Sequence, residues 1–371
     1  MKTKKLLKTI LSIPSESRKC DEMRGFLEEH CKGMGYSVAG DKKENLYVVK
    51  GSAAEYPCVV AHMDTVHKIE KGGIHVVEIG GFVTGINPNT MRQTGIGGDD
   101  KCGIYAALRC LDYLDNCKVA FFVDEEVGCQ GSKNCELGFF KDTRFVLQAD
   151  RRGHSDWVDK ISGDPLGSDD FQKAVEPIIE KYGYAPCGGM MTDVMALRDQ
   201  SVGVSVANMS AGYFNPHSDY ESVSLIALED VTNMMIEMCM TLDKPFPFVH
   251  VPKVQPVSTV CGPRNGRNAG GSGYRGNYGS GYGHWWGEDS PMDAQTGSKV
   301  HKDARRVEGR EPFPDWSPMH SSNNGNGIVE LCDTECAMCG CQAPKSQCMF
   351  VGSNTFLCLK CAHDIDAGTL G

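Results

Sequence analysis

Three consecutive acids follow a run of apolar residues about a third of the way along the chain. Residues 121–123 (FFV) predict a buried strand, and Asp124, Glu125 and Glu126 come directly after it. Adjacent carboxylates repel one another, and removing them from water costs several kcal/mol each unless positive charge lies beside them. In open α/β sheets, ligands bind at the carboxyl ends of strands. The stretch therefore predicts a site that holds cations, whereas a solvated acidic turn is the plainer interpretation.

Further stretches hold side chains that bind metal ions. His62 ends a predicted strand, and the carboxylate of Asp64 can accept the second ring proton of this histidine. Taken singly, each stretch has a plainer interpretation, such as a core histidine or an aspartate that caps a helix. Two ions about 3.5 to 4 Å apart need a bridging carboxylate, terminal ligands and a free base. The chain supplies candidates for each place: His62, Asp99, Asp100, Glu125, Glu126, Asp150 and His217.

Strands and helices alternate over the first 245 residues, which predicts one catalytic domain. The alternation implies an α/β fold with a mainly parallel mixed sheet and helices on both faces. The hydrophobic patterns predict helices over 2–11, 18–34, 101–115, 168–182, 192–199 and 222–242. They predict strands over 36–39, 46–50, 58–61, 74–79, 82–86, 118–123, 144–149, 157–161 and 202–207.

The charge of the chain bears on its partners. At 371 residues the chain is long enough for two domains. Its net charge is −10, and the first 245 residues hold 27 Lys and Arg against 36 Asp and Glu. Nonspecific nucleic-acid binding needs clustered cations, so this acidity makes nucleic acid an unlikely partner and suits a protein that holds metal cations.

The apolar runs and the scattered cysteines bear on the compartment. No run approaches the roughly 18 to 20 residues that a membrane-spanning helix needs. The start, MKTKKLLKTILSI, is a poor signal peptide because Lys8 interrupts its apolar part and no small-residue cleavage site follows. Ten cysteines lie singly over residues 20–239, which is typical of a reducing compartment. These features predict a cytoplasmic protein without a membrane partner.

Beyond residue 245 the periodic pattern stops. Residues 246–330 are rich in Gly, Pro, Ser and Asn and have too few aliphatic residues for a core. We interpret them as a disordered, flexible linker. Aromatic and arginine side chains in GGSGYRGNYGSGYGHWWGED could stack on nucleic-acid bases, but few cations accompany them.

Residues 331–371 predict a zinc-binding module. Cys336 and Cys339 form one CxxC, and Cys358 and Cys361 form a second after 18 intervening residues, a spacing typical of a zinc ribbon. Four thiolates make a closed tetrahedral site, which favours one structural Zn²⁺ over a catalytic ion. Four neighbouring residues are further candidates for this site: Cys332, Cys341, Cys348 and His363.

The order of the motifs in the first domain resembles a known group of enzymes. HMDTV, GGDDKCG, DEEVG, AD and NPHSDYE follow one another as the ligand motifs do in the M20 and M28 di-zinc exopeptidases. The opening, with LSIPSES and ENLYVV, is similar to the peptidase T-like branch of M20. The resemblance covers roughly residues 5–243 and implies a zinc-exopeptidase fold with two Zn²⁺, or Co²⁺ or Mn²⁺ in their place.

The resemblance also implies a role for each matching residue. His62 would bind one ion with Asp64 orienting it, Asp99 would bridge both ions, and Glu125 would be the general base. The terminal metal ligands would be Glu126, Asp150 and His217. Two bound cations lower the pKa of a water between them, so the base could take its proton and pass it to the leaving amine.

The chain departs from the usual M20 arrangement in one respect. M20 chains usually insert a lid or dimerisation domain between the ligands that match Asp150 and His217. Only 66 residues separate Asp150 and His217 here. The hydrophobic pattern of these 66 residues predicts strands and helices of the same domain. We therefore expect no lid, as in M28 aminopeptidases. Asp193, in the stretch that normally follows the lid, would either bind a substrate amine or cap a helix.

The module at 331–371 is similar to the zinc-binding domain of the unfoldase ClpX. CxxCG, VGSN and FLCLKCAHD occur in the same order over about 35 residues, although the ATPase of that family is missing. The resemblance implies a protein partner or self-association through this module.

Together these features predict a metal-dependent exopeptidase that hydrolyses short peptides, as an aminopeptidase or a di- or tripeptidase. Two alternatives stay open at the level of sequence. One is an M20-type amidohydrolase or deacylase that acts on N-acyl amino acids with the same metals. The other is a non-catalytic adaptor or binding protein that works through the zinc module.

Overall fold

The computed structural model describes residues 2–68 and 71–251, together with four short strands between residues 333 and 358. The predicted linker beyond residue 251 lies outside the described residues. So do three of the four predicted zinc ligands, Cys336, Cys339 and Cys361. The fourth, Cys358, is the last residue of a short strand of which only the backbone is described.

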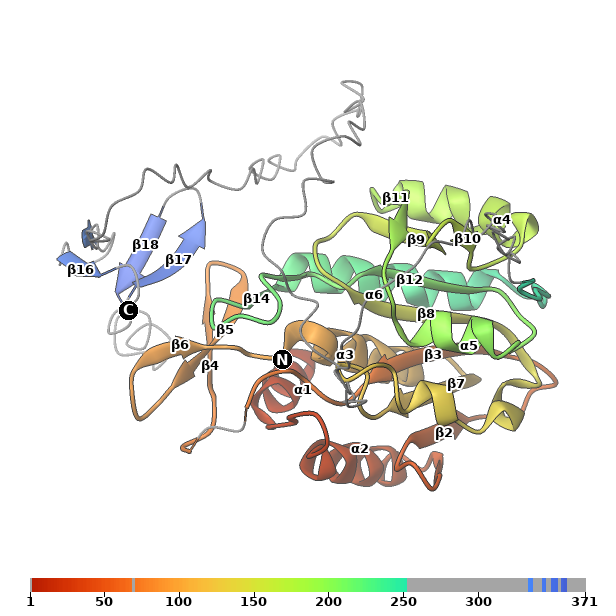
Figure 1. Ribbon diagram of the computed structural model, residues 1–371, viewed down its shortest axis with the longest axis horizontal. Helices are drawn as coiled ribbons and strands as arrows, with labels where there is room; N and C mark the ends of the chain where they lie inside the picture. The colour runs from red at the N-terminus through yellow and green to blue at the C-terminus, as the bar shows by residue number, and fades with distance from the viewer. Residues whose placement is uncertain are drawn as a thin grey trace, which may run out of the picture. The chain divides into compact units, whose positions relative to one another are not determined.

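A nine-stranded sheet forms the centre of the first domain (Figure 1). Its strands are β1 (Ser37–Gly40), β2 (Leu46–Lys50), β3 (Tyr56–His62), β7 (Cys117–Phe122), β8 (Thr143–Arg151), β9 (Asp156–Ile161), β10 (Asp164–Pro165), β11 (Ala185–Gly189) and β12 (Val206–Ser210). The order is β1-β2-β7-β3-β8-β12-β9-β10, and β11 pairs with β9. The central strands β7, β3, β8 and β12 run parallel, whereas β1, β2 and β10 pair antiparallel with their neighbours. The predicted α/β class with a mixed sheet is confirmed.

Helices cover both faces of this sheet (Figure 1). They are α1 (Lys2–Ser12), α2 (Asp21–Gly33), α3 (Gly98–Tyr113), α4 (Asp169–Lys181), α5 (Asp193–Asp199) and α6 (Leu225–Thr241), with short 3-10 turns η1 (Ser132–Asn134) and η2 (Leu137–Phe140). One apolar cluster joins one sheet face to α1, α2, α3, α4 and α6. A second cluster joins the opposite face to α5 and η2.

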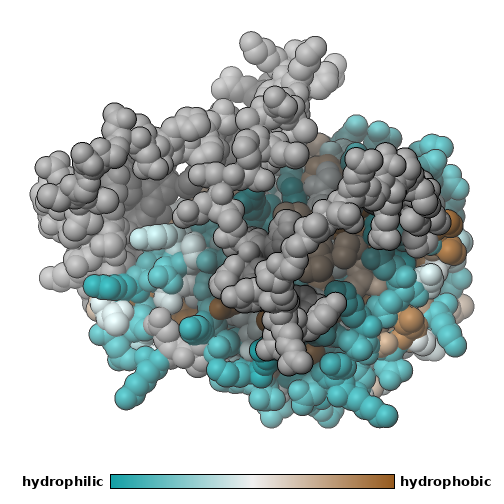
Figure 2. Space-filling model, in the orientation of Figure 1, coloured by the Kyte–Doolittle hydropathy of each residue, from teal (hydrophilic) through white to brown (hydrophobic). Residues whose placement is uncertain are grey.

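Strand β3 shows why its sequence is a continuous apolar run. Successive side chains of a strand point to opposite faces of the sheet. Val59 and Ala61 accordingly lie in the first apolar cluster, whereas Cys58 and Val60 lie in the second. A strand with helices on both sides needs apolar residues at every position. On the face shown in Figure 2, the described surface is mostly hydrophilic, as this burial of apolar residues requires.

A second sheet has five strands, which come from two separate parts of the chain. It consists of β4 (His75–Ile79), β5 (Phe82–Asn87), β6 (Arg92–Thr94), β13 (Tyr213–Phe214) and β14 (Ser222–Ser224). β4 and β5 form a hairpin with Gly80 and Gly81 at its turn, and these glycines have positive φ angles of 58° and 85°. β14 pairs with β5 in antiparallel register, so the loop between β13 and β14, which contains His217, is fixed to this sheet.

Three expectations about the elements are wrong. The strand expected over 202–207 begins only at Val206, because the backbone pairs with β8 from that residue onward. The helix expected from 222 begins at Leu225, and residues 222–224 form β14 instead. Phe246, assigned to the linker, is 2% exposed and packs against Phe145 and Phe171, so the first domain extends beyond residue 245.

The described part of residues 331–371 consists of two antiparallel strand pairs. β15 (Asp333–Glu335) pairs with β16 (Gln342–Pro344), and β17 (Cys348–Gly352) pairs with β18 (Thr355–Cys358). Among the helices that the structure describes, none is both long and apolar enough to traverse a lipid bilayer.

Candidate metal centre

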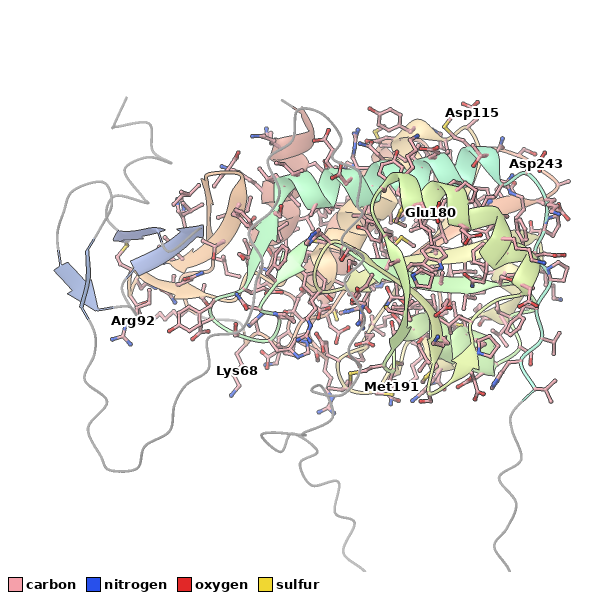
Figure 3. The ribbon with its side chains drawn as sticks, turned by 90° about the horizontal axis from the view of Figure 1, so that it is seen from above. Lys68, Arg92, Asp115, Glu180, Met191 and Asp243 are labelled. Carbon is pink, nitrogen blue, oxygen red and sulfur yellow. The ribbon has the colours of Figure 1, made fainter. Side chains whose placement is uncertain are left out.

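Three of the five candidate ligands come from the carboxyl ends of parallel central strands. His62 is the last residue of β3, Asp150 is the last but one of β8, and Glu125 and Glu126 follow β7. In Figure 3, Asp115 lies at the edge of the view opposite Met191. Asp115 follows α3 and Met191 precedes α5, so the two residues adjoin helices that cover opposite faces of the sheet.

Asp99 lies on the turn that opens α3. Gly97 precedes it with a φ of 68°, the left-handed region that favours glycine. Asp99 and Asp100 have non-helical backbone angles although they belong to the first turn. This departure separates their side chains: Asp100 turns inward, where it accepts the backbone N–H groups of His62 at 3.1 Å and Gly103 at 3.0 Å.

The two carboxylate oxygens of Asp99 face two different groups of side chains. Asp99 Oδ1 lies 3.2 Å from His62 Nε2, which in turn lies 3.5 Å from Asp150 Oδ1. Asp99 Oδ2 lies 3.3 Å from His217 Nε2, which lies 3.1 Å from Glu126 Oε1. The ligand atoms within each group lie within 4.8 Å of one another. Asp99 is therefore shared by two sets of three donors, each with one histidine and two carboxylates.

His62 is oriented by a backbone carbonyl. Its Nδ1 lies 2.9 Å from the carbonyl oxygen of Asp64 and 3.5 Å from the carboxylate of the same residue. We expected the carboxylate to accept this ring proton, but the carbonyl is nearer. A histidine held in this way presents Nε2 to the other ligands with a defined tautomer.

The environment of one candidate ligand atom indicates whether a cation fits this site. Glu126 Oε1 is buried and accepts no hydrogen bond from the residues that the structure describes, although His217 Nε2 lies 3.1 Å away. Buried carboxylate oxygens without a hydrogen bond are rare and destabilising. Together with histidine and carboxylate donors, which suit Zn²⁺ and similar ions, this atom fits a cation ligand.

The pKa values of the site show an excess of negative charge. Burial and the charge of Asp99 raise the pKa of Asp150 to about 8. Burial raises the pKa of Glu125 well above its usual range, although the charge of His62 opposes this. The neighbouring carboxylates of Asp99 and Glu126 raise the pKa of His217 to about 10. Bound divalent cations would relieve this repulsion and favour the ionised carboxylates.

Glu125 points to a different neighbour from Glu126. Its Oε1 accepts a hydrogen bond from the thiol of Cys129 at 3.4 Å, and neither group of donors that shares Asp99 includes it. Asp124, the first acid of the triplet, has a φ of 56° and accepts the backbone N–H of Arg18 at 2.7 Å. The three adjacent carboxylates therefore have three different environments.

Asp193 has neither of the two roles expected for it. Thr192 is the residue that precedes α5, so Asp193 is not its N-cap. The side chain of Asp193 is fully buried and accepts a hydrogen bond from Ser132 at 2.5 Å, which removes it from contact with a substrate. Its other oxygen lies 3.4 Å from the amide nitrogen of Gln148, which also donates to Asp150 at 3.1 Å.

The residues between Asp150 and His217 add to the same domain. They form β9, β10, β11 and β12 of the nine-stranded sheet, together with α4, α5 and β13. All of these residues are described, and none of them builds a separate lid. This agrees with the expectation from the short spacing.

Several residues of the site escaped the sequence analysis. Gln148 lies two positions before Asp150 on the same strand, so the period of two could have placed both on one face. The hydroxyl of Tyr213 lies 3.4 Å from Asp150, but no sequence pattern indicates that these two residues are neighbours. Glu221 ends the motif that contains His217, but its contacts with Gly97 and Asp99 join residues more than 120 positions apart.

The fold is similar to solved structures of two peptidases. The aminopeptidase PepT of Bacillus cereus ATCC 10987 aligns with a TM-score of 0.55 and 13% identity, covering 65% of this chain and 98% of that one. A tripeptidase of Staphylococcus aureus subsp. aureus Mu50 aligns with a TM-score of 0.54 and 14% identity, covering 65% and 97%. At the level of sequence, no family pattern and no curated protein matches the chain. At such identities the likeness shows the fold.

Proposed function

We propose that the first domain is a metal-dependent exopeptidase with a site for two divalent cations. The observation that carries the proposal is the position of Asp99, whose two oxygens face two separate histidine-containing groups. A carboxylate that bridges two ions needs this arrangement. His62 and Asp150 would hold one ion, and Glu126 and His217 the other. Zn²⁺ is the ion we favour, with Co²⁺ or Mn²⁺ as substitutes.

The residues of the chain then divide the work of hydrolysis. The cations, when bound, polarise the scissile carbonyl and lower the pKa of a water molecule. Glu125, which is not in either donor group, takes the proton of the attacking water and delivers it to the leaving amine. Its raised pKa in the buried site suits a group that must both accept and release a proton.

We propose short peptides as the substrates. The two proteins of similar fold are an aminopeptidase and a tripeptidase, which supports peptides over other amides. A complete set of donors and a separate base supports an enzyme over a non-catalytic adaptor. N-acyl amino acids are the substrates to be tested against this choice, because the same metal chemistry would hydrolyse them.

One experiment separates these substrates. The full-length protein is assayed against di- and tripeptides with free amines and against N-acetylated amino acids, with and without a chelator. We expect hydrolysis of the free-amine peptides, loss of this activity with the chelator, and recovery on addition of Zn²⁺ or Co²⁺. Turnover of the acylated compounds alone would exclude the aminopeptidase assignment.

We further propose that Cys336, Cys339, Cys358 and Cys361 bind one structural zinc ion. Two CxxC pairs at this spacing support the proposal. The module would serve self-association or the binding of a protein partner in the cytoplasm.

A further inference from the structure

The carboxylate of Glu221 is enclosed by backbone groups of the turn that carries Asp99. The side chain of Glu221 is fully buried. Its Oε2 accepts the backbone N–H of Gly97 at 2.7 Å, and its Oε1 accepts the backbone N–H of Asp99 at 3.0 Å. His67 Nε2 lies 2.9 Å from Oε2 as well. A buried carboxylate is tolerated where hydrogen bonds of this kind satisfy it.

The turn packs too closely against Tyr213 and Thr65 for residues that carry a Cβ atom at positions 97 and 98. A Cβ atom on Gly98 would lie 3.4 Å from Glu221 Oε1 and only 2.8 Å from Cβ of Tyr213. Gly97 combines a left-handed φ of 68° with a hypothetical Cβ 2.7 Å from a methyl group of Thr65. The two glycines therefore let the backbone reach the carboxylate. The position of Asp99 depends on this close approach.

Glu221 belongs to the same loop as His217. Its backbone carbonyl accepts the hydroxyl of Thr84 at 3.0 Å, and its backbone N–H donates to the carbonyl of Ser218 at 3.2 Å. The next residue, Ser222, begins β14 and pairs with Thr84 of β5. The loop that holds one histidine ligand is thus fixed to the smaller sheet and bonded directly to the turn of the bridging aspartate.

We propose that Glu221 is a positioning residue that holds Asp99 and His217 at the separation that the second cation needs. This inference rests on the proposed two-cation site. His62 and Asp150 lie on strands of the larger sheet, so they keep their places without Glu221. The ion bound by Glu126 and His217 depends on the loop and on the turn together. Loss of Glu221 should therefore weaken this ion more than the other.

Glu221→Gln probes the contact with little change in volume. Glutamine has one acceptor oxygen where glutamate has two, and the NH2 group that replaces the other oxygen cannot accept a hydrogen bond from a backbone N–H. Either the N–H of Gly97 or that of Asp99 then lacks an acceptor in a buried place, and the turn must shift. Glu221→Asp keeps the charge but shortens the reach. Thr84→Val is the matched control, because it removes a contact of the same loop without touching the turn.

The test is a titration of the metal-free, full-length protein with Co²⁺, followed by visible absorption and calorimetry. Thiolate-bound Co²⁺ gives intense charge-transfer bands, which separate the cysteine module from sites with nitrogen and oxygen donors. The wild type and Thr84→Val should bind two ions at the latter sites. Glu221→Gln should bind the ion of Glu126 and His217 about 10- to 100-fold more weakly, and the other ion, which shares Asp99, should weaken much less. Thermal unfolding of the metal-free variants shows whether each is folded.

Each result has a defined meaning. Unchanged binding of both ions by Glu221→Gln would overturn the positioning role, as would equal weakening of both ions in a folded protein. If Glu221→Gln fails to fold, the same comparison is made with Glu221→Asp, in which the second ion should again weaken more than the first. A wild type that binds Co²⁺ only through its cysteines would instead overturn the proposed two-cation site itself.

Discussion

The backbone N–H of Glu125 donates a hydrogen bond of 2.9 Å to Oδ1 of Asp64. The other oxygen of Asp64 accepts the backbone N–H of Glu126 at 3.3 Å and the hydroxyl of Ser17 at 2.7 Å. The carboxylate near His62 therefore holds in place the segment that carries the proposed base and one proposed ligand. Its main effect is on the backbone after β7, whereas the carbonyl of Asp64 orients the histidine.

Asp64→Asn should lower turnover while the protein keeps its metal ions. The amide group that replaces one oxygen cannot accept a hydrogen bond, so a backbone N–H of residue 125 or 126 loses its partner. We expect kcat to fall about 10- to 100-fold with an unchanged metal content. Ser17→Ala, which removes one donor and no acceptor, should have a smaller effect. Loss of metal from Asp64→Asn would show that its carboxylate serves the ligands instead.

Glu125→Gln should retain both ions and lose most of its activity. Removing a general base costs about 10²- to 10⁴-fold in rate, and glutamine cannot carry the proton. Asp124→Asn is the matched control, because asparagine tolerates the positive φ of 56° and still accepts the N–H of Arg18. We expect near-normal turnover from this control. Normal turnover of Glu125→Gln would remove Glu125 from its role.

Asp99→Ala should remove more metal than a change at either terminal ligand. The side chain of Asp99 faces both donor groups, whereas His217 faces only one. Elemental analysis of full-length protein should show a loss of two ions per chain for Asp99→Ala and of one for His217→Ala. Comparison with the wild type cancels any zinc in the cysteine module. Equal losses from the two variants would contradict the bridging position.

Cys187 should react slowly with alkylating reagents despite its partial exposure. Burial and the charge of Asp156 raise the pKa of its thiol to about 11, and only the thiolate reacts. At pH 8 we expect alkylation by iodoacetamide roughly 10²-fold slower than that of free cysteine. Because the pKa is raised, the rate should rise about tenfold per pH unit up to pH 10. Peptide mapping measures it, and Cys187→Ser identifies the peptide.

The cysteine module should contribute one zinc ion per chain. Cys336→Ser and Cys358→Ser each remove one ligand of a four-thiolate site, so either change should lower the zinc content by one ion. Activity on short peptides should stay unchanged in both variants. Serine at Cys332, which lies outside the CxxC pairs, is the control and should leave the zinc content as it is.

The sequence predicted the larger sheet well because its strands are continuous apolar runs. β3, β7 and β8 are buried along nearly their whole length, which leaves a local pattern that needs no partner to be recognised. Their carboxyl ends also meet at one edge, so the placement of His62 and Asp150 in one site follows from parallel strand order.

The smaller sheet was harder to predict because its pairing is distant in sequence. Residues 222–224 look like the start of a helix, and only their pairing with β5 makes them a strand. The contacts of Glu221 have the same origin, because their donors lie on a turn whose position depends on the fold. Val202 and Val204 alternate as in a strand, but they pack against the second apolar cluster before β12 begins.

The connection between α1 and α2 limits where the chain can be opened. Residues 15–18 lie beside Thr65, with backbone hydrogen bonds in both directions, and also bond to Asp64 and Asp124. A circular permutant with new termini within 15–18 should therefore lose activity although no proposed ligand is removed. New termini at the largely exposed residues 51–54 should be tolerated. An engineered version of this protein can be rearranged at residues 51–54, whereas residues 15–18 must stay intact.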